Sequence, residues 1–223
     1  PWLCVCLKPV LRTEVRLRLD EGGHAPRVGE ALLGADAAEL AALRLALELR
    51  ERWPGARVLA LSVGPPSAEG VLRVCLAAGA DEVARVWGAE WGREPAALDG
   101  TGAVTQAQAG AAAAALRGRA PALVLAGERS ADTGHECFGA FLAAALGAAF
   151  AHRATALRLQ DAGWRVTVRL ERGYGQELAL PAGAVVTVSA QGPRPGYPSL
   201  PAWLASRAAP IPCLRAAGPA PQP

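Results

Sequence analysis

Short apolar runs alternate with helix-forming segments over the first two thirds of the chain, and this alternation constrains the fold more than any other feature. The runs are almost continuously apolar, as expected for strands buried on both faces of a sheet. We predict these strands at residues 2–7, 56–63, 81–87 and 122–126. We predict helices at residues 36–51, 68–79, 104–116 and 138–146. The alternation indicates an α/β fold with a mostly parallel, doubly wound sheet and flanking helices.

The rhythm changes after residue 147. Four predicted strands follow one another at residues 154–159, 164–170, 176–180 and 184–189, separated by glycine-containing turns. We interpret them as a C-terminal antiparallel meander that extends one edge of the sheet or forms a small second sheet. An alternating segment at residues 13–19 predicts a further, half-exposed strand. We expect one domain over residues 1–190 and a Pro-rich tail over residues 191–223.

The composition of the 223 residues excludes several classes of protein. Gly, Arg or Asp interrupts every apolar run before it reaches membrane-spanning length, so we expect no membrane insertion. The net charge is +3 and the 23 basic residues are scattered, which argues against a nucleic-acid partner. The five cysteines fit neither a disulfide framework nor a CxxC pair, and the first residues do not resemble a secretory signal. All basic residues except Lys8 are Arg, which indicates GC-rich coding, and we expect a cytoplasmic bacterial protein.

Ligands of parallel α/β sheets bind at the carboxyl ends of the strands, here the loops after Leu7, Val63 and Ala126. The second and third of these loops, SVGPPSAEG and AGERSADTGHECFG, contain glycines and lead into helices. Backbone N–H groups and the positive end of a helix dipole at such a junction can hold an anion. Neither loop matches a P-loop or GxGxxG, so a phosphate site and a plain connection both stay open at this point.

The third loop also contains residue types that ligate metals or act as nucleophiles. Its possible ligands are Asp132, His135, Glu136 and Cys137. A metal site is disfavoured because adjacent residues point apart and no second His or Cys group completes a tetrahedral set. Cys137 with His135 or His152 as its base is disfavoured too, since a cysteine that begins an apolar helix usually packs in the core. The residues indicate a binding fold without visible catalytic machinery.

The stretch SVGPPSAEGVLRVCLAAGADEV resembles the beta subunit of electron transfer flavoproteins, the FixA family. That family has a strand ending in Gly-Pro, a helix and an Ala-x-Gly-Ala-Asp turn, matched by Gly64, Pro65 and residues 77–81. Other similar segments are VCLKPV, VLAGERSAD, WRVTVRLERGYGQELALPAGAVVTVS and PRPGYPSLPAW, so the resemblance covers roughly residues 2–206. It implies an adenine nucleotide alpha-hydrolase-like fold, with the nucleotide bound by the domain over residues 1–190.

The resemblance implies an electron carrier subunit and not an enzyme. In the family the beta subunit forms a heterodimer with a larger alpha subunit that carries the redox FAD. The beta subunit holds AMP or, in one branch, a second FAD that bifurcates electrons. The chain would then pass electrons between flavin-dependent dehydrogenases and the FAD of the alpha subunit. Leu200 falls on the leucine that inserts into partner dehydrogenases, with packing of the tail onto the domain as an equal alternative.

The family's cofactor-binding positions carry over onto three short stretches and one loop. Cys6 would lie beside the adenine through its backbone, Val63 would border the nucleotide, and the loop after Ala126 would hold phosphate mostly by backbone N–H groups. The expected cofactor-binding residues are Cys6, Asp36, Ala37, Ala38, Glu39, Val63, Gly127, Glu128, Arg129, Ser130, Ala131, Asp132, Thr133, Gly134, His135, Glu136, Cys137 and Phe138.

The sequence departs from the family pattern at several positions. Cys137 and Phe138 replace Gln followed by Thr or Val, and Glu136 adds a negative charge beside them. Asp36-Ala37 replaces Asn-Pro, and Gly183 replaces a proline. The sequence ends soon after PAWLASR, without the family's long C-terminal arm. These departures favour an alternative: a non-redox adenine-nucleotide-binding module of the same fold that has lost the carrier function.

Overall fold

The computed structural model describes residues 1–12, 21–22, 33–88, 91, 103–161 and 163–216, and the strand predicted at residues 13–19 lies outside them. Its centre is a nine-stranded sheet with the strand order β11-β5-β4-β1-β6-β10-β7-β8-β9. Neighbours from β11 to β7 in this order are parallel, and β8 is antiparallel to both β7 and β9. The predicted α/β class with a mostly parallel sheet is confirmed.

The elements have the following bounds. The strands of the large sheet are β1 (Trp2–Leu7), β4 (Arg57–Val63), β5 (Glu82–Val86), β6 (Leu123–Gly127), β7 (Phe150–Gln160), β8 (Gly163–Arg169), β9 (Gly175–Pro181), β10 (Ala184–Val188) and β11 (Cys213–Leu214). A separate antiparallel pair consists of β2 (Pro9–Leu11) and β3 (Leu33–Ala35). The helices are α1 (Ala37–Arg52), α2 (Glu69–Ala78), α3 (Ala103–Arg117), α4 (Phe138–Leu146) and α5 (Leu200–Ala208), with short 3₁₀ turns η2 (Pro66–Ala68) and η4 (Glu171–Gly173).

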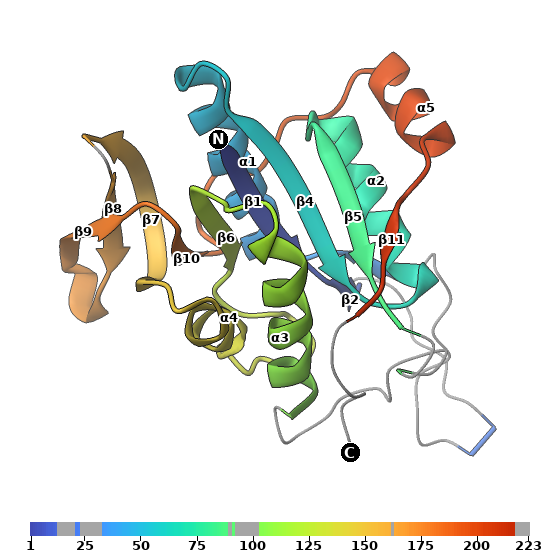
Figure 1. The fold of residues 1–223 in the computed structure, drawn as a ribbon, viewed down its shortest axis with the longest axis horizontal. Coiled ribbons are helices and arrows are strands. Elements are labelled where there is room, and N and C mark those ends of the chain that lie inside the picture. Colours follow the sequence, from blue (N-terminus) through green and yellow to red (C-terminus); the bar gives the residue numbers. More distant parts are fainter. Residues whose placement is uncertain (13–20, 23–32, 89–90, 92–102, 162, 217–223) are drawn as a thin grey trace.

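Helices cover both faces of the parallel part of the sheet (Figure 1). One core layer lies between the strands and the pair α1 and α2, and the other lies between the strands and the pair α3 and α4. Successive residues of β1 alternate between the layers: Leu3 and Val5 face α1, whereas Cys4 and Cys6 face the opposite layer. This alternation explains why the strands read as continuous apolar runs. No helix in the described ranges has the length and apolar character required to span a bilayer.

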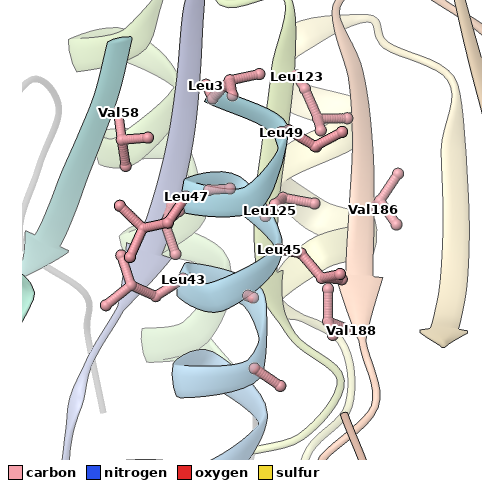
Figure 2. Packing of buried hydrophobic residues seen from close by; sticks show 14 of the residues in the cluster. Leu3, Leu43, Leu45, Leu47, Leu49, Val58, Leu123, Leu125, Val186 and Val188 are labelled. Atoms are coloured by element: carbon pink, nitrogen blue, oxygen red, sulfur yellow. The ribbon is translucent and has the colours of Figure 1, made fainter. Parts of the chain in front are cut away.

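Helix α1 packs along the middle of the sheet and anchors one layer. Asp36 caps its first turn through the N–H of Ala38, and Arg50 and Arg52 lie in its last turn, where they complement the helix dipole. Figure 2 shows its leucines between residues of four strands. The labelled residues are Leu3, Leu43, Leu45, Leu47, Leu49, Val58, Leu123, Leu125, Val186 and Val188. Burial of each such side chain stabilises the fold by about 1.5–3 kcal/mol, so this packing fixes where α1 begins relative to the strand ends.

The prediction of a four-stranded meander is wrong for its last strand. Strands β7, β8 and β9 do form an antiparallel edge, but β10 returns into the sheet and lies parallel between β6 and β7. All five residues of β10 are buried. A strand that is apolar on both faces gains more from a central position than from an edge, where one face and one row of hydrogen-bonding groups would meet water.

The C-terminal tail returns to the sheet after a short helix. Strand β11 pairs with β5, and α5 packs on α2. Arg73 on α2 fixes the end of α5, because its Nη1 donates hydrogen bonds to the carbonyls of Ser206, Arg207 and Ala209 at 2.7, 2.9 and 2.9 Å. The tail thus packs onto the domain through α5 and β11, at the opposite end of the sheet from the meander.

Candidate functional site

A pocket opens where β1, β4 and β6 end side by side. Its floor is formed by apolar residues at these strand ends, among them Leu61, Val63 and Ala126. The loop between β6 and α4, residues 128–137, forms one wall and is called the β6–α4 loop below. Glu39 on α1 and Thr105 on α3 reach the pocket from opposite faces of the sheet. The pocket thus lies at the carboxyl edge of parallel strands, the usual ligand position of this architecture.

The structure brings most of the expected cofactor-binding residues to this pocket. Those that line it are Cys6, Glu39, Val63, Gly127, Glu128, Arg129, Ser130, Thr133, His135, Glu136, Cys137 and Phe138. Expected residues that do not line it are Asp36, Ala37, Ala38, Ala131, Asp132 and Gly134. Lining residues that the sequence prediction missed are Leu7, Lys8, Leu61, Thr105, Gln108 and Ala126.

Asp36 supports the site from behind the pocket. Its Oδ1 accepts the N–H of Ala38 at 2.8 Å and so caps α1, while its Oδ2 accepts the N–H of Ala131 in the β6–α4 loop at 2.9 Å. Gly127 allows the same close approach, since a Cβ there would lie 3.1 Å from the Cβ of Ala38 and 3.2 Å from the backbone N of Glu39. One carboxylate and one glycine therefore fix the loop against the start of α1.

Lys8 organises the middle of the β6–α4 loop. Its Nζ lies 2.7 Å from Oδ1 of Asp132 and 3.4 Å from Oγ1 of Thr133. Asp132 Oδ1 also accepts the N–H of Thr133 at 2.7 Å, and the hydroxyls of Ser130 and Thr133 are 2.8 Å apart. Two features of the sequence could have indicated Lys8 as a site residue: it is the one lysine of the chain, and it directly follows the first predicted strand. Its charge therefore stabilises the loop beside the pocket.

Glu39 carries a buried carboxyl group at the pocket wall. Its Oε1 accepts the backbone N–H of Lys8 at 3.0 Å. Its Oε2 is buried and has no hydrogen-bond partner among the described residues. Burial raises the pKa of Glu39 from 4.5 to about 8, with the Lys8 N–H opposing the rise and the charge of Asp36 adding to it. Burial at this position therefore favours the neutral form of the carboxyl group.

The outer half of the β6–α4 loop is held by separate, partly exposed contacts. His135 Nδ1 lies 3.2 Å from the hydroxyl of Thr105. Glu136 has a positive φ of 55° and lies 3.9 Å from Arg129 and 3.8 Å from His152. Three of the four candidate metal ligands, Asp132, His135 and Glu136, thus each have a partner of their own. Among the described residues no His, Cys, Asp and Glu side chains gather into a metal site.

Cys137 and Phe138 form the junction of the loop with α4. Burial raises the pKa of the Cys137 thiol, which is opposite to the activation that a nucleophile requires. Phe138 presents an apolar ring to the pocket at the first position of α4. The N–H groups at the start of an α-helix lack intrahelical acceptors, so this junction offers donors for an anion. The arrangement favours binding by backbone donors over covalent chemistry.

Gly139 has a packing role next to this junction. A Cβ at this position would lie 2.3 Å from Cγ2 of Thr187 on β10 and 3.1 Å from Phe150. The absence of a side chain therefore allows α4 to lie directly on β10 and β7. This contact sets the position of the helix start at the pocket.

Leu200 lies outside the pocket, at the first position of α5. Its side chain is 67% exposed, and Trp203 and Leu204 on the same helix are also exposed, at 42% and 53%. Ser199 caps the helix by accepting the N–H of Ala202 at 3.3 Å. A rigid, apolar helix start on the surface is compatible with a docking contact.

Comparison with known proteins gives one consistent result. The profile of the electron transfer flavoprotein domain matches residues 34–218. The electron transfer flavoprotein subunit beta of Bradyrhizobium diazoefficiens is 28% identical over 93% of the chain and 78% of its own length. The subunit of the same name from Syntrophomonas wolfei is 29% identical over 96% of the chain and 79% of its own length. The caffeyl-CoA reductase-Etf complex subunit CarD of Acetobacterium woodii is 38% identical over 36% of the chain and 30% of its own length.

Proposed function

The chain belongs to the electron transfer flavoprotein family and is similar to its beta subunits, and from this we propose that it is the nucleotide-binding beta subunit of a heterodimeric electron carrier. It would pass electrons between flavin-dependent dehydrogenases and the FAD of an alpha subunit. The observation that carries this proposal is the coincidence of the family match with a pocket at the carboxyl ends of β1, β4 and β6.

The pocket residues fit an adenine nucleotide, either AMP or the AMP half of FAD. Leu61, Val63 and Ala126 offer an apolar floor for a planar base. The start of α4 offers backbone donors for phosphate, and Arg129 lines the pocket with a positive charge. Glu39, which also lines the pocket, adds a carboxyl group whose Oε2 has no hydrogen-bond partner among the described residues. FAD, when bound, would supply the redox chemistry, and the residues of this chain would position it.

The exposed start of α5 supports the partner proposal. Leu200 stands on a capped helix that Arg73 ties to α2, so its position on the surface is fixed before any partner arrives. An exposed leucine on a rigid support loses little entropy on docking. We assign this surface to the dehydrogenase.

A specific observation favours the second candidate, an adenine-nucleotide-binding module without the carrier function. Phe138 and Glu136 both line the pocket beside the start of α4. The ring of Phe138 cannot donate to a phosphate, and the carboxylate of Glu136 repels one. If the chain is such a module, its nucleotide would make fewer phosphate contacts than the nucleotides bound by other members of the family.

Co-expression with the candidate alpha subunit of the same genome separates these functions. The complex is purified, its nucleotides are released by heat, and each is quantified by chromatography. The carrier function predicts a yellow heterodimer with one FAD and one AMP, or with two FAD if the subunit bifurcates electrons. A nucleotide-loaded chain that forms no heterodimer supports the second candidate. If the chain forms no heterodimer and also carries no nucleotide, both candidate functions are contradicted.

A further inference from the structure

We propose that Gln108 on α3 recognises the base of the bound nucleotide, with its side-chain amide paired to the donor and the acceptor on one edge of adenine. The inference rests on the proposed function, because it presumes that the pocket holds an adenine nucleotide. It adds a residue that selects the base, and this residue comes from a helix that contributed nothing to the site predicted from the sequence.

One face of α3 changes character where it reaches the pocket. Along most of the helix this face is core, and Ala109, Ala112 and Leu116 are fully buried. Thr105 and Gln108 continue the same face toward the helix start, at the three-, four- and seven-residue spacing of one helix face, and both line the pocket. Polar side chains thus replace alanine and leucine where the face leaves the core. Such a local break in an apolar pattern is typical of functional sites.

The amide of Gln108 is free to bind a ligand. Gln108 is half-buried and lines the pocket, yet no hydrogen bond joins its amide to any of the described residues. Its amide nitrogen and oxygen are unpaired but not sealed from solvent, so they are open to the pocket. Thr105, one turn earlier, is already engaged, because its hydroxyl lies 3.2 Å from Nδ1 of His135. Of these two α3 residues at the pocket, Gln108 is therefore the one without a partner in the described chain.

The position of α3 assigns Gln108 to the base and not to the phosphate. Helix α3 packs over β4 and β5, whereas α4 packs over β6 and β10 (Figure 1). Strand β4 supplies Leu61 and Val63 to the apolar floor, and both lie in the core layer that α3 covers. The backbone donors for phosphate lie at the start of α4, on the β6 side of the pocket. A planar base on the floor at β4 therefore presents an edge to α3.

A side-chain amide suits the edge of adenine. It carries an N–H donor and a carbonyl acceptor in one plane, and adenine carries an amino donor beside a ring-nitrogen acceptor. The carbonyl of Gln108 would accept from the amino group while its N–H donates to the ring nitrogen, so two hydrogen bonds form at once. A base without the amino group leaves the carbonyl of Gln108 unpaired.

The test compares AMP with purine riboside 5′-monophosphate, which lacks only the amino group of the base. Binding to the purified, nucleotide-stripped chain is measured by calorimetry. The wild type should bind AMP about tenfold more tightly than the second ligand. Gln108→Leu should bind AMP about tenfold more weakly than wild type, and its preference for AMP should fall to about twofold. Gln106→Leu is the matched control, because Gln106 is exposed on the same helix and does not line the pocket, and it should keep the full preference.

A smaller side chain covers the case in which leucine blocks the pocket. Gln108→Ala leaves the pocket open and should show the same loss of preference, with a thermal unfolding curve that matches wild type. An unaltered preference in Gln108→Ala would overturn the role of Gln108. Equal losses of affinity for the two ligands would overturn it as well, since the amide would then contact the ribose or the phosphate. If the wild type binds neither AMP nor FAD, the nucleotide site itself is contradicted, which separates a failure of the proposed function from a failure of base recognition.

Discussion

Replacing Glu39 with glutamine should make the stability of the protein less dependent on pH. Burial raises the pKa of Glu39 in the folded state from 4.5 to about 8, so the folded protein holds this proton more tightly than the unfolded chain. The stabilisation from the bound proton is complete below the unfolded pKa and is lost as the pH rises toward the folded one. At 1.36 kcal/mol per pH unit of difference, the loss between pH 5 and pH 9 is about 3–4 kcal/mol. An amide cannot ionise, and the variant should not lose this amount.

The assay is urea unfolding followed by far-UV circular dichroism at pH 5, 7 and 9. The free energy of unfolding of Glu39→Gln relative to wild type should increase steadily with pH and level off above pH 8. Glu48→Gln is a control on the same helix, since Glu48 is partly exposed and pairs with Arg44 at 2.7 Å. Its pH profile should follow that of the wild type. Parallel profiles for wild type and Glu39→Gln would show that the carboxyl group is not held neutral by its burial.

Three further substitutions test the supports of the site and the docking surface. Gly139→Ala places a Cβ against Thr187 and should destabilise the protein by about 2 kcal/mol, whereas Gly110→Ala in open space on α3 should not; equal thermal melts would refute the close packing of α4. Asp36→Ala removes the cap of α1 and a contact with the β6–α4 loop, so it should lower the free energy of unfolding by about 1–2 kcal/mol and speed amide hydrogen exchange in that loop. Unchanged exchange would contradict the role of the Asp36 hydrogen bond in holding the loop. Leu200→Ala should raise the KM of a partner dehydrogenase for the carrier by about tenfold with unchanged stability, and an unaltered KM would exclude this residue as the anchor.

The fold was largely predictable because each core strand carries its own signal. Residues 2–7, 57–63 and 123–127 are mostly buried, mainly apolar runs flanked by turns or helices, so each run indicates a strand without reference to distant residues. The place of β10 was not predictable from its turn with Gly183, which resembles a hairpin connection. That place depends on pairing with β6, about 60 residues earlier, and on burial of both faces.

The site was predictable to the level of its loops but not of its contacts. A strand–helix junction with glycines indicated the β6–α4 loop directly. Lys8 was missed because its partner Asp132 is 124 positions away in the sequence. Glu39 was expected at the site, but an acidic residue in the first turn of a helix usually complements the dipole in water. Glu39 is buried because Gly127 packs closely against the start of α1, a tertiary contact that the local sequence does not indicate.

A crystal structure of the chain in complex with its alpha subunit and the co-purified nucleotide would test the central claim most directly. We predict an adenine nucleotide in the pocket at the ends of β1, β4 and β6, with phosphate at the start of α4. A nucleotide bound elsewhere, with this pocket closed by side chains of either subunit, would contradict the account.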